Sequence, residues 1–268
     1  MDTAEILFLV IYCAILVGLC FYGAHRYHMA WIYHRHRSDT PELPEIPEGE
    51  SFQPKVTIQL PIFNERYVIE RLVEYVCAIR YPRELLEIQV LDDSTDDTTE
   101  IARRVVDRAH AQGVNIKYIH RTDRTGFKAG ALEAGMKVAE GEFIAVFDAD
   151  FTPTPDFLEK TIPYFYDDGI GMVQARWDHI NRDFSLLTQA QSILLDGHFV
   201  IEHTARNRSG RFFNFNGTAG VWRKSCIESA GGWDHDTLTE DLDLSYRAQL
   251  KGWRFVFLND LLAPAEVP

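Results

Sequence analysis

The stretch Phe143-Ile144-Ala145-Val146-Phe147-Asp148-Ala149-Asp150 joins an apolar run to two carboxylates. Ile, Val and Phe favour a buried strand. Asp148 and Asp150 are two residues apart, so an extended backbone points both side chains to the same side. Like charges held together repel unless a cation lies between them, and Mg²⁺ commonly binds one or two carboxylates together with substrate phosphates. The stretch therefore predicts a metal site at a strand end, with an ordinary polar turn as the alternative.

The composition is that of a folded, acidic protein. The chain has 268 residues, and 40 acidic against 27 basic residues give a net charge of −13. This balance argues against a nucleic-acid partner, because general nucleic-acid binders are normally basic. The four cysteines show no Cys-x-x-Cys spacing, so the sequence indicates neither a zinc site nor a disulfide framework.

The N-terminal segment predicts a membrane anchor. Ile6 to Ala24 is apolar and uncharged, close to the roughly 20 residues that cross a bilayer. Acidic residues precede it and basic residues follow it, which predicts an N-terminus outside or in the lumen and the remainder in the cytosol. A signal peptide and a buried soluble helix are the alternatives. We expect an anchor with its basic flank at 1–37, a stiff Pro/Glu linker at 38–54, and a cytosolic domain at 55–268.

Strands and helices then alternate along the chain, which predicts an α/β fold with a mostly parallel sheet and helices on both faces. The expected strands span 56–60, 86–91, 116–120, 143–147, 171–176 and 253–258. The expected helices span 65–79, 98–112, 128–139, 153–165, 185–206 and 242–251. Within the long helix His198 and His203 are five apart, which excludes a metal pair on one α-helical face.

Ligands of such sheets bind beyond the carboxyl ends of the strands, where three polar clusters fall. They are Asn64-Glu65, the run from Asp92 to Asp96, and Asp148-Ala149-Asp150. The second cluster has a structural alternative as a helix cap. The sequence lacks both Gly-x-Gly-x-x-Gly after the first strand and a Gly-Lys-Ser/Thr loop, which disfavours a dinucleotide or P-loop site.

Three later motifs carry further chemistry. Lys128 opens a helix between Gly126 and Gly130, where a diphosphate would be favoured, although a surface lysine is the alternative. The aromatic and amide run 212–220 suits a sugar face, or else an aromatic core strand. Thr239-Glu240-Asp241 is typical of a helix cap and equally of a general base at the lip of an acidic site.

Six motifs in order closely resemble the membrane-anchored family 2 glycosyltransferases of the cellulose synthase and cellulose-synthase-like type, nearest to the glucomannan (β-mannan) synthases. They are Gln59-Leu-Pro-Ile-Phe-Asn64-Glu65, Asp92-Asp-Ser-Thr-Asp96, Gly126-Phe-Lys128-Ala-Gly130, Phe147-Asp148-Ala-Asp150, Phe215-Asn-Gly217-Thr-Ala-Gly and Thr239-Glu240-Asp241. The resemblance covers about residues 55 to 262. It implies a GT-A fold at a bacterial inner membrane or Golgi-type membrane, and inverting transfer from a nucleotide sugar.

The resemblance also implies roles for individual residues. Asp93, with Asp92 beside it, would contact the nucleoside base, within a donor site that includes Asn64 and Glu65. Lys128 would contact the donor diphosphate. Asp148 and Asp150 would hold donor and metal, Mg²⁺ or Mn²⁺. We expect Asp150 to be the principal metal ligand and Asp148 to be shared between metal and ribose.

On the acceptor side, Asp241 matches the catalytic base of the family. The acceptor terminus would be lined by Phe215, Asn216, Gly217, Thr218 and Glu240. The family continues with Gln-x-x-Arg-Trp after Thr-Glu-Asp and with more membrane helices. This chain ends at Pro268, before that motif, and Gln174-Ala-Arg176-Trp177 is one residue too short and lies too early. We therefore expect a fragment or a natural truncation.

The resemblance leaves three functions open. The first is extension of a β-linked polysaccharide by an inverting hexosyltransferase. The second is transfer of one sugar to a lipid, such as ceramide or a polyprenyl phosphate. The third is a non-catalytic nucleotide-sugar-binding fragment. GDP-mannose is the donor implied by the nearest resemblance, and UDP-glucose is the donor implied by the wider family.

Overall fold

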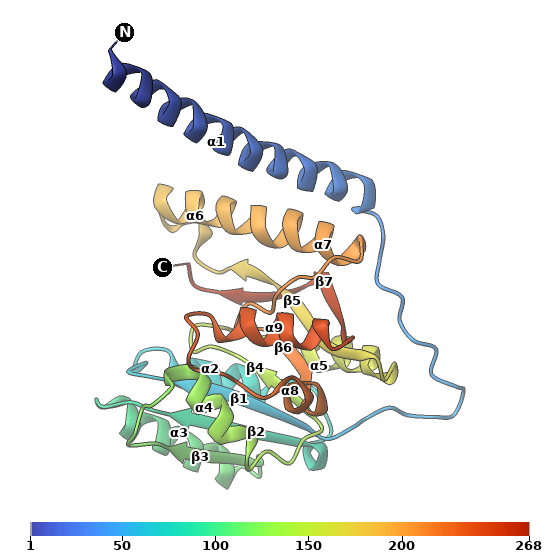
Figure 1. The fold of residues 1–268 in the computed structure, drawn as a ribbon. Coiled ribbons are helices and arrows are strands. Elements are labelled where there is room, and N and C mark those ends of the chain that lie inside the picture. Colours follow the sequence, from blue (N-terminus) through green and yellow to red (C-terminus); the bar gives the residue numbers. More distant parts are fainter. Residues whose placement is uncertain (1, 268) are drawn as a thin grey trace.

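The computed structural model describes residues 2–267, and these form one α/β sheet domain with a long helix at its N-terminal end (Figure 1). The strands are β1 (Val56–Ile62), β2 (Leu86–Asp92), β3 (Ile116–His120), β4 (Phe143–Val146), β5 (Ile170–His179), β6 (Gly220–Arg223) and β7 (Arg254–Ala265). They form one sheet in the order β3-β2-β1-β4-β6-β5-β7.

The sheet has a parallel half and a mixed half. β3, β2, β1 and β4 are parallel neighbours, with Val56 opposite both Leu86 and Phe143. β6 runs antiparallel to β4 and β5, whereas β7 is parallel to β5. This arrangement confirms the predicted mostly parallel sheet.

The helices lie on both faces of the sheet, except the N-terminal helix, which packs on another helix (Figure 1). They are α1 (Thr3–His36), α2 (Ile69–Cys77), α3 (Thr98–Ala111), α4 (Phe127–Met136), α5 (Phe157–Thr161), α6 (Leu186–Asp196), α7 (Thr204–Arg208), α8 (Lys224–Ala230) and α9 (Glu240–Leu250). Three 3₁₀ turns are η1 (Arg83–Leu85), η2 (Ile162–Tyr166) and η3 (Arg182–Phe184), and η4 (Gly197–His203) is a π-helical segment.

Two apolar clusters hold these layers together. One packs α2, α3 and α5 against one face of the sheet, and Ile58 and Leu60 of β1 are fully buried in it. The other packs α4, α8 and α9 against the opposite face around Trp222 and Phe257. Period-2 alternation sends successive residues of a strand to these two faces, which is why the core has two parts.

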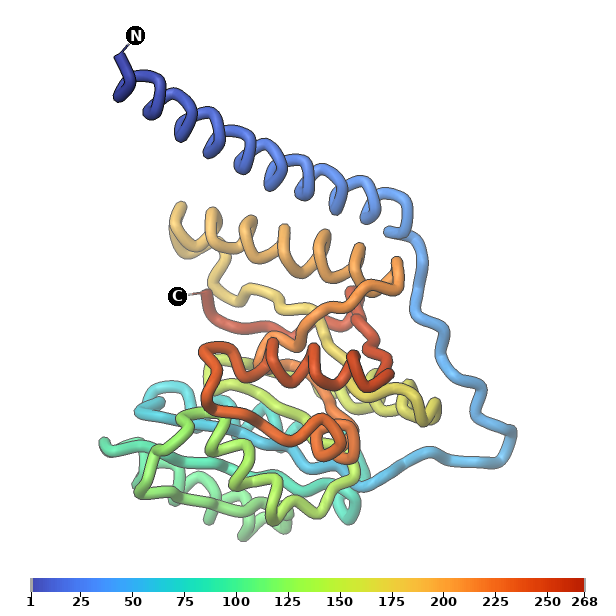
Figure 2. The backbone as a smooth tube through the Cα atoms, in the orientation of Figure 1, coloured from blue at the N-terminus to red at the C-terminus, as the bar shows by residue number. Residues whose placement is uncertain are grey.

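The helix α1 is long and apolar enough to cross a membrane, and its most apolar part is exposed. It begins with a reciprocal cap between Asp2 and Glu5. Its C-terminal end packs on α7, where Met29 and Ile32 are buried against Ala205. Residues 38–54 then run outside the domain in an extended path to β1 (Figure 2).

Several predicted elements differ in the structure. The predicted helix over 185–206 is divided by the π-helical turn η4, and the predicted helix over 153–165 is divided into α5 and η2. The strand β6 and the helix α8 are not among the predicted elements. Residues 211–219 form neither helix nor strand, so the aromatic run contributes Phe213 and Phe215 to the core without extending the sheet.

Candidate active site

A cavity of about 520 Å³ opens at the carboxyl ends of β1, β2 and β4. Its walls come from five chain segments that are separate in the sequence. They carry Phe63 and Glu65 after β1, Asp93 after β2, Arg124 and Lys128 at the start of α4, Asp148 and Asp150 after β4, and Glu266 after β7. The parallel strands bring these segments together because their carboxyl ends lie at one edge of the sheet.

The carboxylates of this cavity are crowded. Burial raises the pKa of Asp150, and the charge of Asp148 raises it further. Burial likewise raises the pKa of Glu65, followed by the charges of Asp150 and Asp148. Such hard oxygen ligands, gathered without enough positive charge, fit a divalent cation such as Mg²⁺ or Mn²⁺. Asp148 and Asp150 are the residues that would hold it.

Lys128 is the basic group that faces these carboxylates. Its Nζ forms an ion pair with Asp148 Oδ1. It lies in the first turn of α4, after Gly126, whose φ of 76° favours glycine. A Cβ on Gly130 would lie 2.2 Å from the carbonyl oxygen of Thr125, so this close backbone approach requires glycine.

Asp241 lies beside the same group, at the start of α9. A Cβ on Gly217 would lie 3.2 Å from Lys128 Nζ and 3.4 Å from Asp241 Oδ2, so one glycine separates the lysine from the carboxylate. Burial raises the pKa of Asp241, and the neighbouring charge of Glu240 adds to the effect, whereas Lys128 opposes it. The arrangement places a carboxylate of increased basicity next to the ammonium group of Lys128.

The chain belongs to glycosyl transferase family 2. The model of that family matches residues 57–229. The chain is 48% identical over 235 residues to glucomannan 4-β-mannosyltransferase 1 of Oryza sativa subsp. japonica, a match over 86% of this chain and 44% of that protein. It is 45% identical over 229 residues to glucomannan 4-β-mannosyltransferase 9 of Arabidopsis thaliana, over 84% of this chain and 43% of that protein. It thus spans less than half the length of these relatives.

Solved structures share the fold. The mannosyltransferase PcManGT from Pyrobaculum calidifontis, in complex with GDP-Man and Mn²⁺, superposes with a TM-score of 0.74 at 25% identity, over 95% of this chain and 68% of that one. Residues 1–349 of S. aureus TarS with UDP-GlcNAc superpose with a TM-score of 0.59 at 17% identity, over 80% and 59% of the two chains. The GT-A fold and the resemblance to cellulose-synthase-like enzymes are confirmed.

The family 2 motifs after β1 and β2 divide between lining the cavity and supporting its wall. Glu65 and Asp93 line the cavity. Asn64 instead joins the two loops, since its backbone N–H donates to Ser94 Oγ (2.9 Å) and its Oδ1 accepts from the N–H of Thr95 (3.0 Å).

Asp92 is placed differently from Asp93. Its carboxylate is fully buried, accepts from the Tyr118 hydroxyl and from the N–H of Ser94, and is not among the residues that line the cavity. It supports the loop after β2 in this structure, and its contact with a nucleoside base stays a prediction. Asp93 does face the cavity, where Arg121 holds it through two hydrogen bonds.

The predicted acceptor residues divide in the same way. Phe215 and Thr218 are fully buried, and their role at the acceptor terminus stays a prediction. Phe215 packs edge-on against Trp222, and Thr218 Oγ1 accepts from the backbone N–H of Asp148 (2.8 Å). Asn216 and Glu240 are half-buried, and Gly217 is buried between Lys128 and Asp241. The Phe215–Thr218 segment therefore supports the loop that carries Asp148, through the hydrogen bond of Thr218.

Phe63, Arg124 and Glu266 also line the cavity. Phe63 lies within the quoted Gln59–Glu65 motif, and the guanidinium carbon of Arg124 lies 3.3 Å from the centre of its ring. A flat ring covered by a cation is a surface on which a base can stack. Glu266 pairs with Arg71 at 2.5 Å and lies at the end of β7, where the sequence offered no motif to single it out.

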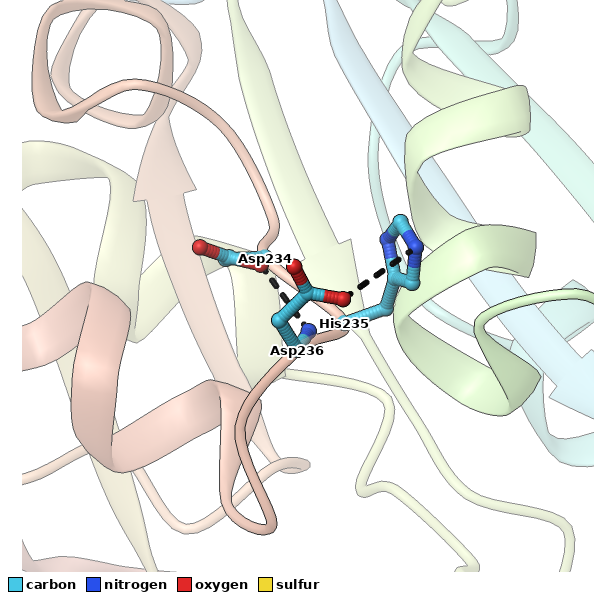
Figure 3. A group of neighbouring side chains, drawn as sticks. All are labelled: Asp234, His235 and Asp236. Carbon is cyan, nitrogen blue, oxygen red and sulfur yellow. Dashed lines mark hydrogen bonds and ion pairs between the residues drawn. The ribbon is translucent and has the colours of Figure 1, made fainter.

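Asp234, His235 and Asp236 form a second acidic group, in the loop before α9 (Figure 3). All three are exposed, and the backbone N–H of Asp236 donates to Asp234 Oδ1 (2.9 Å). His235 points toward α4, where its Cβ would meet a Cβ on Gly126 at 3.0 Å. A turn closed by its own hydrogen bond needs no cation, so we assign no metal site here.

Proposed function

We propose that this chain carries the donor-binding and catalytic part of an inverting hexosyltransferase that extends a β-linked polysaccharide. The observation that supports this most directly is that Asp148 pairs with Lys128, while Gly217 lies between Lys128 and Asp241. A diphosphate-binding cation, a metal-binding pair and a base are the three parts that such a transfer needs within one site.

Each of these residues has a separate role in the proposed reaction. Asp148 and Asp150 would hold Mg²⁺ or Mn²⁺, which offsets the charge of the departing nucleoside diphosphate. Lys128 binds the diphosphate from the start of α4. Asp241 takes the proton from the acceptor hydroxyl as that oxygen attacks the anomeric carbon. Its raised pKa makes it a better base than an exposed aspartate.

GDP-mannose is the donor we favour. The plant relatives are named as glucomannan 4-β-mannosyltransferases, and the structural neighbour was solved with GDP-Man and Mn²⁺. In the proposed pose the base lies between Asp93 and the Phe63–Arg124 stack, because both line the same cavity as the metal pair. UDP-glucose is the alternative.

The long helix α1 supports action at a membrane. We propose that it anchors the chain, that residues 38–54 are a spacer, and that residues 55–268 form the cytosolic transferase domain, with the N-terminus outside or in the lumen. The aromatic rings of Tyr22, Tyr27 and Trp31 lie on the exposed surface of α1, where they suit a membrane interface.

The test is donor binding by the whole chain in detergent, measured by calorimetry with GDP-mannose and UDP-glucose in Mn²⁺ and again in EDTA. We expect metal-dependent binding of one donor, preferably GDP-mannose. Equal affinity in Mn²⁺ and in EDTA would refute the metal-bridged site. Donor binding without sugar transfer would favour a non-catalytic fragment, and a single lipid-linked sugar as product would favour the lipid acceptor over the polysaccharide.

A further inference from the structure

The π-helical turn η4 brings His198 and His203 together. Their ring centres lie 4.5 Å apart with an interplanar angle of 65°. On an α-helix residues five apart diverge, but the wider π turn bonds i to i+5 and places them on one face. The sequence predicted that His198 and His203 lie on different faces of an α-helix, and this prediction is wrong because the segment is π-helical. Single π turns are rare and often occur at functional sites.

Both histidines contact the side chain of Asn216. His198 Nε2 lies 3.2 Å from Asn216 Oδ1, and Asn216 Nδ2 lies 3.4 Å from His203 Nε2. Burial lowers the pKa of His203 to about 3, so its ring is neutral and one nitrogen accepts from the amide. Asn214 Nδ2 also donates to Asn216 Oδ1 (3.1 Å). The amide of Asn216 is thus held from both ends.

The next residue along the chain is Gly217, which separates Lys128 from Asp241. The backbone of this loop is held by side chains from other elements. The N–H of Phe215 donates to Ser245 Oγ (2.8 Å) on α9, and the N–H of Asn216 donates to Gln174 Oε1 (3.3 Å) on β5. A displacement of Asn216 therefore reaches the catalytic centre through one peptide bond.

The other ring nitrogen of His198 faces away from the loop and toward the anchor. His198 Nδ1 lies 3.5 Å from Glu202 Oε2, and Arg26 Nη1 of α1 lies 3.0 Å from the same oxygen. Arg206 binds the second oxygen of Glu202 at 2.8 Å. The hydrogen bond to His198 and the charge of Arg206 lower the pKa of Glu202 to about 2, so this carboxylate is ionised at neutral pH. Polar contacts thus run without a break from α1 to the loop.

We propose that His198 is a positioning residue that fixes Asn216 beside the catalytic centre, and that Glu202 and Arg26 tie this contact to the helix α1. The proposal rests on the proposed function in taking Asp241 and Gly217 as the reacting centre. Its consequence is that seating α1 on the domain orders the acceptor side of the site. We expect a smaller effect on donor binding, because Glu65, Asp93 and Asp150 are held on the separate loops that follow β1, β2 and β4.

Arg26→Gln provides the test, with Arg182→Gln as its matched control. Both arginines form an ion pair with the α6–η4 segment, but Arg182 pairs with Asp196 at 3.5 Å, which does not lead to Asn216. Hydrogen exchange of the amides in 212–219 is measured by mass spectrometry on the full chain in detergent. We expect Arg26→Gln to speed this exchange by about tenfold, because the substitution removes one hydrogen bond between charged groups. Arg182→Gln should leave the exchange unchanged. Equal exchange in the two variants would overturn the proposal.

His198→Gln and His198→Leu separate the two contacts of the ring. Gln keeps a donor near the position of Nε2 and loses the contact to Glu202, whereas Leu loses both. We expect the rise in the acceptor KM to be larger for Leu than for Gln, by about tenfold, with kcat and the Kd of GDP-mannose with Mn²⁺ nearly unchanged. The same ranking is expected for the exchange of the Asn216 amide. Equal values for Leu, Gln and wild type would refute the positioning role. If the wild type shows no metal-dependent donor binding, the proposed function is refuted. The hydrogen-exchange comparison of Arg26→Gln with Arg182→Gln still tests the positioning role of His198.

Discussion

The proposed donor side and the proposed acceptor side of the site are built differently. On the donor side the functional residues follow directly from the ends of the parallel strands β1, β2 and β4, so a few residues of local sequence are enough to place each of them. On the acceptor side Gly217 and Asp241 lie on a loop and a helix start that antiparallel pairing, a π turn and buried side chains bring into place. Substitutions should therefore act locally on the first side and through several partners on the second.

The largest expected effect is at the strand end. Asp150→Ala should abolish metal-dependent donor binding, because it removes the half-buried carboxylate that we propose as the principal metal ligand. Asp97→Ala is the control, since this exposed carboxylate pairs with Arg66 at the same sheet edge and does not line the cavity. Calorimetry with GDP-mannose, in Mn²⁺ and in EDTA, measures both variants. If donor binding by Asp150→Ala still depends on Mn²⁺, Asp150 is not the principal metal ligand.

The second effect concerns the acceptor side and spares donor binding. Asp241→Asn keeps the shape of the side chain but not its basicity, so turnover should fall by about a hundred- to ten-thousand-fold. Asp243→Asn, on the same helix and paired with Arg247 at 2.6 Å, is the matched control. Single-turnover transfer at saturating donor measures the difference. Near-normal turnover in Asp241→Asn would mean that another group is the base.

A smaller effect is expected at Lys128, which contacts both sides. Lys128→Ala should weaken donor binding by about 1.5–3 kcal/mol, the range for a hydrogen bond to a charged group. Lys137→Ala, an exposed lysine at the opposite end of α4, should not change donor affinity. If both substitutions have the same effect, Lys128 contributes only through the overall charge.

The pH dependence of turnover tests the environment of Asp241. Burial raises its pKa, so the proton binds at a higher pH than for a free aspartate near 3.9, and the base is lost earlier as the pH falls. The acid limb of kcat at saturating donor should therefore lie above the free aspartate value. An acid limb at or below that value would contradict a buried base.

The smallest effect separates backbone strain from crowding of the site. Gly217 and Gly210 both have positive φ, 77° and 69°, so an alanine at either should cost roughly 1–2 kcal/mol of stability. The Cβ on Gly217 would meet Lys128 and Asp241, whereas Gly210 faces open space. Thermal unfolding should shift alike in both variants, but only Gly217→Ala should lower transfer. Equal loss of transfer would show that strain alone matters.

Much of the fold could be predicted because strand and helix patterns are local. The alternating apolar residues of β1 and β2 and the continuous apolar run of β4 indicate buried strands, and the carboxylates that follow them must lie at one edge of a parallel sheet. For the same reason Glu65, Asp93, Lys128, Asp148 and Asp150 were expected at the edge where the cavity lies. Their binding roles remain predictions.

The strand ends, the acidic pair and the long apolar N-terminal helix can be recognised from the sequence, since each depends on neighbours within a few residues. The sequence does not reveal that Asp92, Phe215 and Thr218 are buried, or that a π turn brings His198 and His203 to Asn216. Those outcomes depend on packing between segments that lie far apart in the chain. Packing between distant segments decides how exposed a side chain is, and burial and hydrogen bonds decide its basicity. Residue type and spacing determine neither the exposure nor the basicity.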